Sequence, residues 1–442
     1  MYKQSKFNLY FENGGVTFLY NSHTGVFVTL NKEYQDSFEA IRNKNFKNIP
    51  DQHIEKLKEA GFIVDENTNE YQIYEYLTNK SKYSNDYLGL TIATTLQCNF
   101  RCPYCYEDHM DSYFDEDKEK NLVDFVFKNL EGKRDLSITW YGGEPLLQLD
   151  MINRVSKQLI EKCTEEKINY HFNMVSNGYL LTRNVAEHLV NENKIESVQI
   201  TLDGGPKTHN MTRILRNGKG TFNKIMDNIK EICDIIKVNI RVNVSQDNIK
   251  DVHELFPILL ENDLNRKVSV YFAPVTSHEG SCQSVTESCL RTEEFSKWET
   301  ELINYADRLG FDMGKLYPSN LGGSVCTAVS DNTLVIDSNG NLYKCWNEVG
   351  KDHLKVGTLS DGITNNERYF NWIGWSFPNK CYDCEVFPLC KGRCPDMSQG
   401  GKEFECHSIK YNIIDRLLRY YNIHISDKSE QESTKVDKSV LI

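Results

Sequence analysis

Three closely spaced cysteines are the residues most able to do chemistry. Cys98, Cys102 and Cys105 are separated by three and by two residues. Thiolates at this spacing can hold three irons of a 4Fe-4S cluster and leave the fourth iron without a protein ligand. An iron with an open position is where a ligand can bind and react. A structural zinc ion is the alternative, but such an ion normally has a closed set of four ligands.

A second group of cysteines follows residue 310, where Cys, Gly and Pro become frequent. Its members are Cys326, Cys345, Cys381, Cys384, Cys390, Cys394 and Cys406. A segment of this composition cannot build a large apolar core, so we expect it to fold around metal. A zinc ribbon is the alternative, and the Cys381/Cys384 pair alone would suggest one.

The composition argues against nucleic-acid and membrane partners. The 442 residues carry a net charge of -12, whereas proteins that follow a phosphate backbone carry a basic face. No apolar run approaches the roughly 18 residues that a membrane span needs, and the chain starts with polar sequence. We therefore expect a cytoplasmic protein. Fourteen cysteines in such a protein indicate metal or cluster ligation, since the cytosol keeps thiols reduced.

Strand and helix patterns alternate through the middle of the chain. Strands are expected at 88–94, 136–140, 170–175, 197–202, 238–244 and 268–273, and helices at 116–130, 151–162, 184–191, 222–236 and 252–260. Such repeated units predict an α/β fold with parallel strands and right-handed crossovers. Six units make a partial (β/α)6 TIM-like barrel. The first cysteine group follows the first strand, at the carboxyl end where barrels carry catalytic groups.

The first eighty residues form a separate pattern. Turn residues Asn13-Gly14-Gly15 predict a hairpin over 7–20, followed by a strand at 25–30, helices at 32–42 and 51–60, and a short strand at 61–64. This indicates a winged-helix-like module over 1–82, with a polar linker at 79–86. We expect the barrel over 86–310, the cysteine-rich domain over 311–410, and a C-terminal helix and disordered tail over 411–442.

Short polar motifs follow the successive barrel strands. These are Gly142-Gly143-Glu144, Ser176-Asn177, Thr201 with Asp203, and then Arg213. With the cysteine triplet and the aromatic Tyr104 before its last member, the chain resembles the radical SAM enzymes. The resemblance implies that Glu144 holds the amino group of S-adenosylmethionine (SAM), Ser176 and Asn177 its ribose, and Arg213 its carboxylate. It also implies that an electron from the reduced cluster cleaves SAM, and that the resulting radical takes hydrogen from a substrate.

The second cysteine group resembles the SPASM domain. The resemblance implies two auxiliary 4Fe-4S clusters, so three clusters in all. Cys381, Cys384, Cys390 and Cys406 would hold one, and Cys326, Cys345 and Cys394 would hold the other, which leaves that cluster one ligand short. Cys282 or Cys289 could complete it, or a substrate thiolate could. Cys163 and Cys233 lie in amphipathic helices and are expected to be core residues.

The N-terminal pattern resembles the recognition element of enzymes that modify ribosomally made peptides. The resemblance implies a precursor peptide bound through its leader and a flavodoxin or ferredoxin-type reductant. We expect a thioether link from a cysteine sulfur to carbon, then a carbon–carbon cross-link, then a sulfatase-maturing oxidation. Trp346 argues against the last, since those enzymes usually have aspartate there. A non-catalytic electron-transfer protein is the rival, although it would have no use for Glu144, Ser176 or Arg213.

Overall fold

The computed structural model describes residues 1–47, 49–276, 287–313, 326–398 and 405–424. The chain divides into two compact units. Unit 1 combines Met1–Ser81, Lys315–Val325 and Ser376–Ile442, and unit 2 combines Lys82–Gly314 and Cys326–Trp375. The cysteine-rich segment thus contributes to both units. The four domain ranges given above stay predictions.

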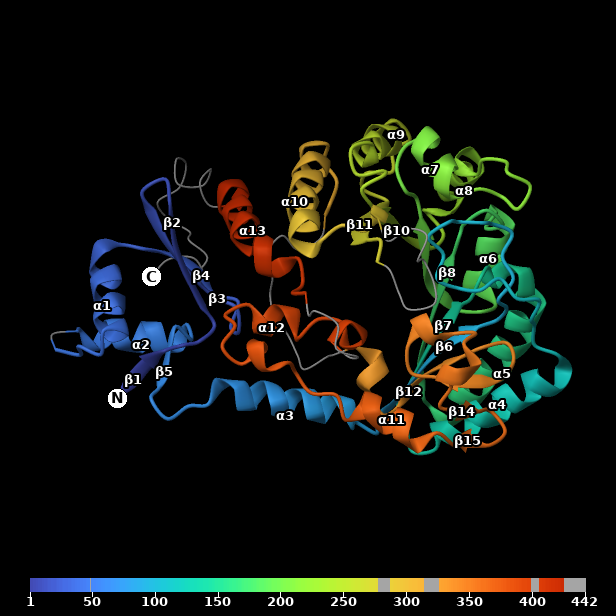
Figure 1. Ribbon diagram of the computed structural model, residues 1–442, viewed down its shortest axis with the longest axis horizontal. Coiled ribbons are helices and arrows are strands. Elements are labelled where there is room, and N and C mark those ends of the chain that lie inside the picture. Colours follow the sequence, from blue (N-terminus) through green and yellow to red (C-terminus); the bar gives the residue numbers. More distant parts are fainter. Residues whose placement is uncertain (48, 277–286, 314–325, 399–404, 425–442) are drawn as a thin grey trace. The chain divides into compact units, whose positions relative to one another are not determined.

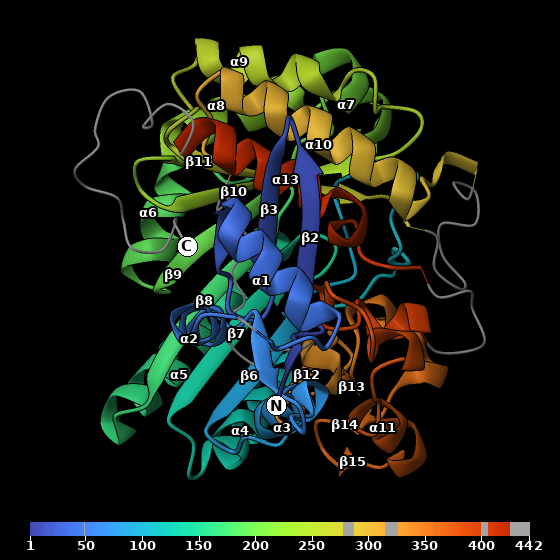
Figure 2. The ribbon, with the colours of Figure 1, turned by 90° about the vertical axis from the view of Figure 1, so that its left-hand side faces the viewer.

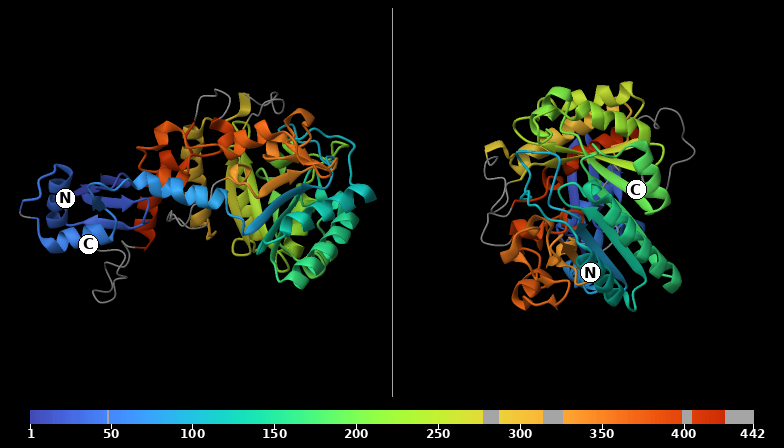
Figure 3. Two further views of the ribbon diagram at one scale, coloured as in Figure 1. Left: turned by 90° about the horizontal axis from the view of Figure 1, so that it is seen from below. Right: turned by 90° about the vertical axis from the view of Figure 1, so that its right-hand side faces the viewer.

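Unit 2 is built on a sheet whose first six strands are parallel and follow one another in chain order. These are β6 (Tyr87–Ala93), β7 (Asp135–Tyr141), β8 (Asn169–Ser176), β9 (Ile195–Thr201), β10 (Lys237–Val244) and β11 (Val268–Pro274). Figure 3 follows them from blue through green to yellow-green. The predicted α/β class and all six strands are confirmed. Because the carboxyl ends of parallel strands share one edge, the loops after them meet there.

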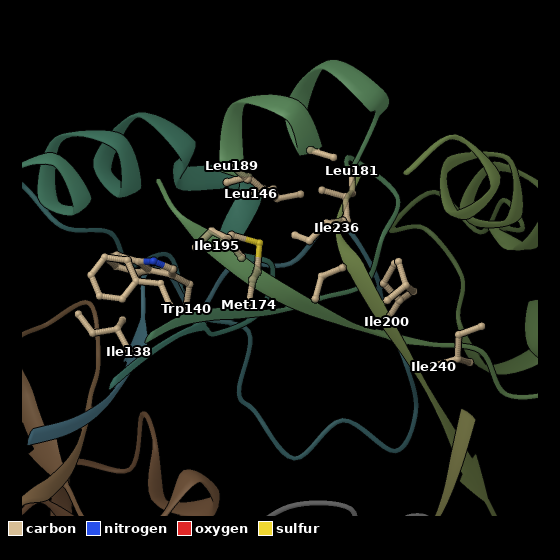
Figure 4. Packing of buried hydrophobic residues seen from close by; sticks show 14 of the residues in the cluster. Ile138, Trp140, Leu146, Met174, Leu181, Leu189, Ile195, Ile200, Ile236 and Ile240 are labelled. Atoms are coloured by element: carbon tan, nitrogen blue, oxygen red, sulfur yellow. The ribbon is translucent and has the colours of Figure 1, made fainter. Parts of the chain in front are cut away.

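Helices cover the outer face of this sheet (Figure 1). They are α4 (Glu116–Leu130), α5 (Leu149–Glu166), α6 (Arg183–Asn191), α8 (Phe222–Ile232) and α9 (Leu255–Glu261). Each turns a stripe of apolar residues with helical spacing toward the strands. Figure 4 shows this layer, with Trp140, Met174 and Ile195 of the sheet gathered near Leu189 of α6. The predicted helices are confirmed, except that α8 ends at Ile232 and not at 236, and that 252–254 form a 3-10 turn before α9 begins at Leu255.

The sheet continues into the cysteine-rich segment. Strand β12 (Thr333–Ile336) pairs in parallel with β6, and β13 (Asn341–Tyr343), β14 (Gly357–Thr358) and β15 (Gly362–Ile363) extend the sheet in antiparallel pairs. Its residues Val335, Ile336, Leu342 and Tyr343 are buried. We expected this segment to fold around metal, and part of it packs instead into the apolar core of the barrel.

Shorter elements complete unit 2. The helices are α7 (Pro206–Thr212), α10 (Thr292–Arg308) and α11 (Asn366–Ile373), and the 3-10 turns are η1 (Pro145–Gln148), η2 (Val252–Glu254), η4 (Thr327–Val329), η5 (Trp346–Glu348) and η6 (Asp352–Leu354). Within the described ranges, no helix has the length and apolar character needed to cross a membrane.

Unit 1 contains two small antiparallel sheets. One pairs β1 (Tyr2–Gln4) with β5 (Ile63–Asp65), and the other orders β2 (Asn8–Asn13), β3 (Val16–Asn21) and β4 (Phe27–Leu30). The predicted hairpin turns at Gly14 and Gly15, which have φ of 58° and 79°. Helix α1 (Lys32–Arg42) lies along this sheet (Figure 2), and its Phe38 and Ile41 are buried in the same cluster as Leu19.

The other helices of unit 1 are α2 (Asp51–Glu59), α3 (Glu70–Lys82), α12 (Phe387–Cys390) and α13 (Ile409–His424), with 3-10 turns η7 (Asn379–Cys381) and η8 (Pro395–Ser398). Helix α13 packs on the three-stranded sheet, where the Tyr421 ring meets Phe18 edge-on at 4.9 Å. The linker predicted at 79–86 is wrong in its first half, because α3 continues to Lys82. The winged-helix assignment stays a prediction.

Candidate active site

A cavity of about 320 Å³ opens at the carboxyl ends of the barrel strands, and the first cysteine group lines it. Burial raises the pKa of Cys98 to about 12, and the nearby Glu144 and Cys102 add to the increase. Burial also raises the pKa of Cys105, with further contributions from Glu107, Cys102 and Cys98. The three thiols therefore face one site. The raised pKa values mean that the protein alone does not stabilise the thiolate form of these cysteines. Metal clusters bind thiolates, so the iron has to stabilise that form.

The Gly142-Gly143-Glu144 segment lies against the start of the cysteine loop. The amide of Gly143 donates to the carbonyl of Thr95, and the amide of Glu144 to that of Gln97, both at 3.0 Å. A Cβ atom on Gly142 would lie 2.3 Å from the Thr95 oxygen, and one on Gly143 would lie 2.2 Å from the Gln97 oxygen. The lack of a side chain at these two glycines thus admits the backbone of the cysteine loop.

Replacing Gly143 by alanine is expected to displace this loop, because a carbonyl oxygen of the backbone cannot rotate away from the new methyl group. We expect the Gly143→Ala protein to bind less than about a tenth of the wild-type iron after reconstitution, a change worth about 1.4 kcal/mol or more in cluster binding. Iron analysis measures this. Gly132→Ala is the control: its φ of 74° costs about 1 kcal/mol of strain, but its Cβ would meet nothing within 4 Å, so the cysteine loop stays in place. Full iron content in Gly143→Ala would contradict the argument.

Glu144 is fully buried and does not line the cavity. Its carboxylate accepts hydrogen bonds from the Ser176 hydroxyl at 2.8 Å, the Asn177 amide at 2.8 Å and the Leu146 amide at 3.1 Å. Its pKa is nevertheless raised, because the effect of burial exceeds that of these bonds. We expected Glu144 to hold the amino group of SAM. In the structure its carboxylate joins the loop after β7 to the loop after β8, and only Ser176 and Asn177 face the cavity.

The Tyr104 hydroxyl connects several of the predicted residues. It donates to Asp203 and accepts from Arg213 Nη1 at 3.0 Å and Asn243 Nδ2 at 3.3 Å. The Thr212 hydroxyl donates to Asp203 at 3.1 Å. Burial raises the pKa of Asp203, although Arg213 favours its charged form. Tyr104 and Arg213 line the cavity, whereas Asp203 does not. Asp203 therefore positions the other two.

Arg213 is held close to the cysteine loop. The amide of Arg101 donates to the carbonyl of Ile214 at 2.9 Å, and the guanidinium of Arg213 lies 5.6 Å from the centre of the Phe100 ring. Its Nε is buried and has no hydrogen-bond partner among the described residues. A guanidinium with an unused N–H in a cavity favours an anionic ligand such as a carboxylate.

His209, which the sequence did not single out, fixes the segment that carries Arg213. Its Nδ1 accepts from the Asp203 amide at 3.4 Å, and its Nε2 lies 3.0 Å from the Thr221 hydroxyl, which donates to the Arg213 carbonyl at 2.5 Å. These contacts require a neutral imidazole with its proton on Nε2. Burial, with a smaller contribution from Arg213, holds the pKa of His209 well below its ordinary value of 6.5.

This lowered pKa predicts acid sensitivity. Below about pH 6.5 the unfolded chain binds a proton that folded His209 does not bind, so the free energy of unfolding falls as the pH decreases. Urea unfolding at about pH 7.5 and about pH 5.5 measures the loss. We expect a smaller loss in His209→Gln and an unchanged loss in the variant of an exposed histidine, His171→Gln. An equal loss in wild type and His209→Gln would refute the assignment.

Further cavity residues were not predicted. Gln199 in β9 and Arg241 in β10 line the cavity. Each comes two residues before another lining residue of its strand, Thr201 or Asn243, as expected for side chains on one face of a strand. The others include Glu107, His109, Tyr141, Trp346 and Asn347. Glu107 is only 6% exposed, and neither carboxylate oxygen has a hydrogen-bond partner among the described residues. Burial raises the pKa of Glu107 to about 8.

Tyr141 lies near both groups of cysteines. Its ring contacts Trp346, with ring centres 4.7 Å apart. Burial raises the pKa of Tyr141, and the thiols of Cys105 and Cys345 add to the increase. The first of these cysteines belongs to the triplet and the second to the later group. Cys345 therefore lies close to the cavity that the triplet lines.

The other cysteines of the second group are divided between the units. Burial, followed by the thiols of Cys390, Cys384 and Cys406, raises the pKa of Cys381 to about 12, so these four lie together in unit 1. Cys326 and Cys345 belong to unit 2, and Cys394 belongs to unit 1. Cys282 lies outside the described residues, and Cys289 is in unit 2. Cys163 and Cys233 contact the barrel core as predicted.

The cysteines and the polar residues of the cavity fit an iron–sulfur cluster together with a ligand that has an amino-acid end. In the described part of the chain, no three His, Cys, Asp or Glu side chains converge on one point, as a single metal ion requires. A zinc ion, for example, needs each cysteine sulfur at a distance of about 2.3 Å. An iron–sulfur cube binds each thiolate through a different iron, so its ligands need not converge on one point. Arg213 and Glu107 are among the lining residues, and the Arg213 Nε and both Glu107 oxygens are buried and have no hydrogen-bond partner among the described residues.

Comparisons with known proteins agree with this site. Residues 92–256 match the Radical SAM superfamily. The chain is 25% identical over 333 residues to the cysteine-type anaerobic sulfatase-maturating enzyme of Clostridium novyi (strain NT), covering 67% of this chain and 84% of that protein. It is 23% identical over 394 residues to the radical SAM cyclopropyl synthase TigE of Paramaledivibacter caminithermalis (strain DSM 15212 / CIP 107654 / DViRD3), covering 81% and 78%.

The fold agrees as well. The crystal structure of Streptococcus suis SuiB bound to precursor peptide SuiA superposes with a TM-score of 0.51 at 17% identity, covering 92% of this chain and 99% of that chain. The matched segment 92–256 contains the three cysteines, the strands β7–β10 and most of the residues that line the cavity. Residues 92–256 are a domain of the Radical SAM superfamily, and the chain is an enzyme whose relatives include a sulfatase-maturating enzyme and a radical SAM cyclopropyl synthase.

Proposed function

We propose that this enzyme modifies a ribosomally made precursor peptide in the cytoplasm by joining a cysteine sulfur of that peptide to a carbon of another residue. One observation supports this most. Tyr141 lines the cavity and lies near Cys105 and Cys345, so one cysteine of the second group lies close to the cavity that the triplet lines. A peptide there would have the radical source on one side and a metal site able to bind its thiolate on the other.

The residues of the triplet site have different roles. Cys98, Cys102 and Cys105 hold a 4Fe-4S cluster. Cluster and SAM, when bound, supply a carbon-centred radical that removes hydrogen from the substrate. Arg213, fixed by Tyr104 and Asp203, binds the carboxylate of SAM. The ribose of SAM contacts Ser176, Asn177 and Thr201. Gly142 and Gly143 have no side chains and let the backbone of the cavity wall approach SAM closely, and Glu144 holds this wall in place.

The second cysteine group would hold two auxiliary 4Fe-4S clusters in a SPASM-type arrangement. Cys381, Cys384, Cys390 and Cys406, which share one neighbourhood in unit 1, supply four ligands to one cluster. Cys326, Cys345 and Cys394 supply three to the other. The fourth position of that cluster is the one we assign to the substrate thiolate. A flavodoxin or ferredoxin-type protein would supply electrons.

The N-terminal module would bind the leader of the precursor. Strands β2 and β4 are the outer strands of its three-stranded sheet, and an extended peptide can add a strand to such an edge through main-chain hydrogen bonds. The alignment with peptide-bound SuiB, which covers 92% of this chain, supports a substrate of this kind.

A carbon–carbon bond is the second candidate product, favoured by the similarity to a cyclopropyl synthase. The similarity to a sulfatase-maturating enzyme favours a simple oxidation, but Trp346 stands in the cavity wall where the resemblance places an aspartate. A non-catalytic electron-transfer role is excluded, because the chain is an enzyme of the radical SAM class.

Co-expression with a precursor peptide encoded beside the gene tests the proposal. A thioether removes two hydrogen atoms per link and protects one cysteine of the peptide from alkylation, and both changes are read by mass spectrometry. The Cys345→Ala enzyme should leave the peptide unmodified, whereas Cys163→Ala, a core change in α5, should not. A peptide that loses hydrogen while all its cysteines stay open to alkylation would contradict the thioether and favour the carbon–carbon product.

A further inference from the structure

Arg241 is a second cationic residue in the wall of the cavity. Among the described residues, its side chain makes one hydrogen bond, from Nε to the Oδ1 of Asn243 at 2.7 Å, and no ion pair with a carboxylate. Its Nη1 and Nη2 atoms do not belong to the buried atoms without a partner, whereas the Nε of Arg213 does. The terminal N–H groups of Arg241 are therefore both unused and accessible.

The guanidinium of Arg241 is held near the part of the cavity where the two cysteine groups approach each other. Asn243, which accepts from its Nε, also donates through Nδ2 to the Tyr104 hydroxyl at 3.3 Å. The charge of Arg241 opposes the increase in the pKa of Tyr141, so the guanidinium lies near that ring. Tyr141 in turn lies near Cys345. The cation is thus fixed in position before any ligand arrives.

A second unused donor lies on the neighbouring strand. Strand β9 pairs in parallel with β10, with Thr201 opposite Arg241. Gln199 comes two residues before Thr201, so the side chains of Gln199 and Arg241 lie on the same face of the sheet, and both line the cavity. The Tyr271 hydroxyl donates to the Oε1 of Gln199, and the Nε2 of Gln199 has no acceptor among the described residues. A guanidinium and an amide on one face fit the two oxygens of a carboxylate.

The protein itself supplies no carboxylate to these donors. Glu107 is the only acidic residue of the described cavity lining, and both of its oxygens are buried. SAM has a single carboxylate, which the proposed function gives to Arg213. We propose that Arg241, together with Gln199, binds a carboxylate of the substrate peptide, from an aspartate, a glutamate or the C-terminus close to the residue that loses hydrogen. This inference rests on the proposed function and names a feature of its substrate.

Steady-state kinetics with the precursor peptide encoded beside the gene tests this role. Synthetic variants would replace each Asp or Glu of the modified region by Asn or Gln, and one would carry a C-terminal amide. We expect one of these changes to lower kcat/KM of the wild-type enzyme by about 10- to 100-fold, as for one lost charge-assisted hydrogen bond. The position of that change shows whether a side chain or the C-terminus supplies the carboxylate.

Enzyme variants show whether Arg241 is the partner of that carboxylate. Arg241→Gln should lower kcat/KM equally with the natural peptide and cause no further loss with the sensitive peptide variant, because both changes remove the same interaction. Its affinity for SAM without peptide, measured by equilibrium dialysis, should stay within about twofold of wild type. Arg134, whose side chain is 74% exposed, gives the control Arg134→Gln, in which all these values are unchanged.

Several outcomes would overturn the inference. These are wild-type enzyme that modifies every peptide variant equally well, an Arg241→Gln enzyme with unchanged kcat/KM, a loss that is the same with every peptide, which indicates a structural role, and a loss of SAM affinity, which indicates a cofactor contact. If Arg241→Gln does not retain iron, Arg241→Lys replaces it, since lysine keeps the charge but loses the paired N–H groups. A wild-type ratio of kcat/KM between the natural and the sensitive peptide then overturns the inference. Wild-type enzyme that modifies no precursor peptide would instead contradict the proposed function itself.

Discussion

Replacing Cys102 by alanine is expected to abolish SAM cleavage. Cys102 lines the cavity with Cys98 and Cys105, and with only three thiols available the cluster cannot lose one and stay in place. We expect the rate of 5'-deoxyadenosine formation to fall by at least about 1,000-fold, equivalent to about 4 kcal/mol of barrier. Chromatography of the reaction mixture measures the product.

Cys163→Ala provides the matched control for that variant. Cys163 is fully buried in α5 and packs in the barrel core, so its loss costs about 1 kcal/mol of stability through a small cavity and leaves the cluster ligands intact. A Cys102→Ala protein that retained wild-type SAM cleavage would show that this residue is not a ligand of the cluster.

Replacing Cys390 by alanine is expected to remove an auxiliary cluster and to destabilise unit 1. Cys390 lies close enough to Cys381 to contribute to its raised pKa. Cys390 and Cys384 also pack against the hydrophobic core that includes residues of α13. Metal sites of this kind contribute several kcal/mol to folding, so we expect a loss of about four irons per chain and a fall in stability of at least ~3 kcal/mol. Iron analysis and thermal unfolding measure the two effects.

The same variant separates the two groups of cysteines by function. The triplet site lies in unit 2 and contains no residue of unit 1, so SAM cleavage without peptide should persist while peptide modification is lost. Unchanged iron and unchanged thermal unfolding in Cys390→Ala would rule out a cluster on this quartet.

The barrel was predictable because its elements are long and periodic. Each of the six strands carries apolar residues in a run or at alternate positions, and helices such as α4 and α5 span three or more turns. Strand β12 has four residues, too few to show a period, and it pairs with β6 from more than two hundred residues away. Such a pairing depends on which edge of the sheet is left open, and no local pattern carries that information.

The predictable features of the site are those that depend on residue type and on the order of the motifs along the chain. The cysteine triplet and the loops after β7, β8 and β9 meet at one edge because parallel strands bring them there. Orientation was not predictable: Glu144 and Asp203 are buried outside the cavity lining, whereas Glu107 belongs to it. One signal was available and not used. Asn239, Arg241 and Asn243 alternate with valine and isoleucine in β10, a pattern that marks a strand with one polar face.

The most direct test of the account is SAM cleavage by the protein itself. Anaerobically reconstituted and dithionite-reduced wild-type protein would be incubated with SAM, and 5'-deoxyadenosine would be quantified together with iron, zinc and sulfide. If the cysteine triplet holds a radical SAM cluster, the protein contains iron and sulfide, and 5'-deoxyadenosine forms only after reduction. Protein that carries zinc in place of iron, or that carries its full complement of iron and sulfide and releases no 5'-deoxyadenosine, would contradict it.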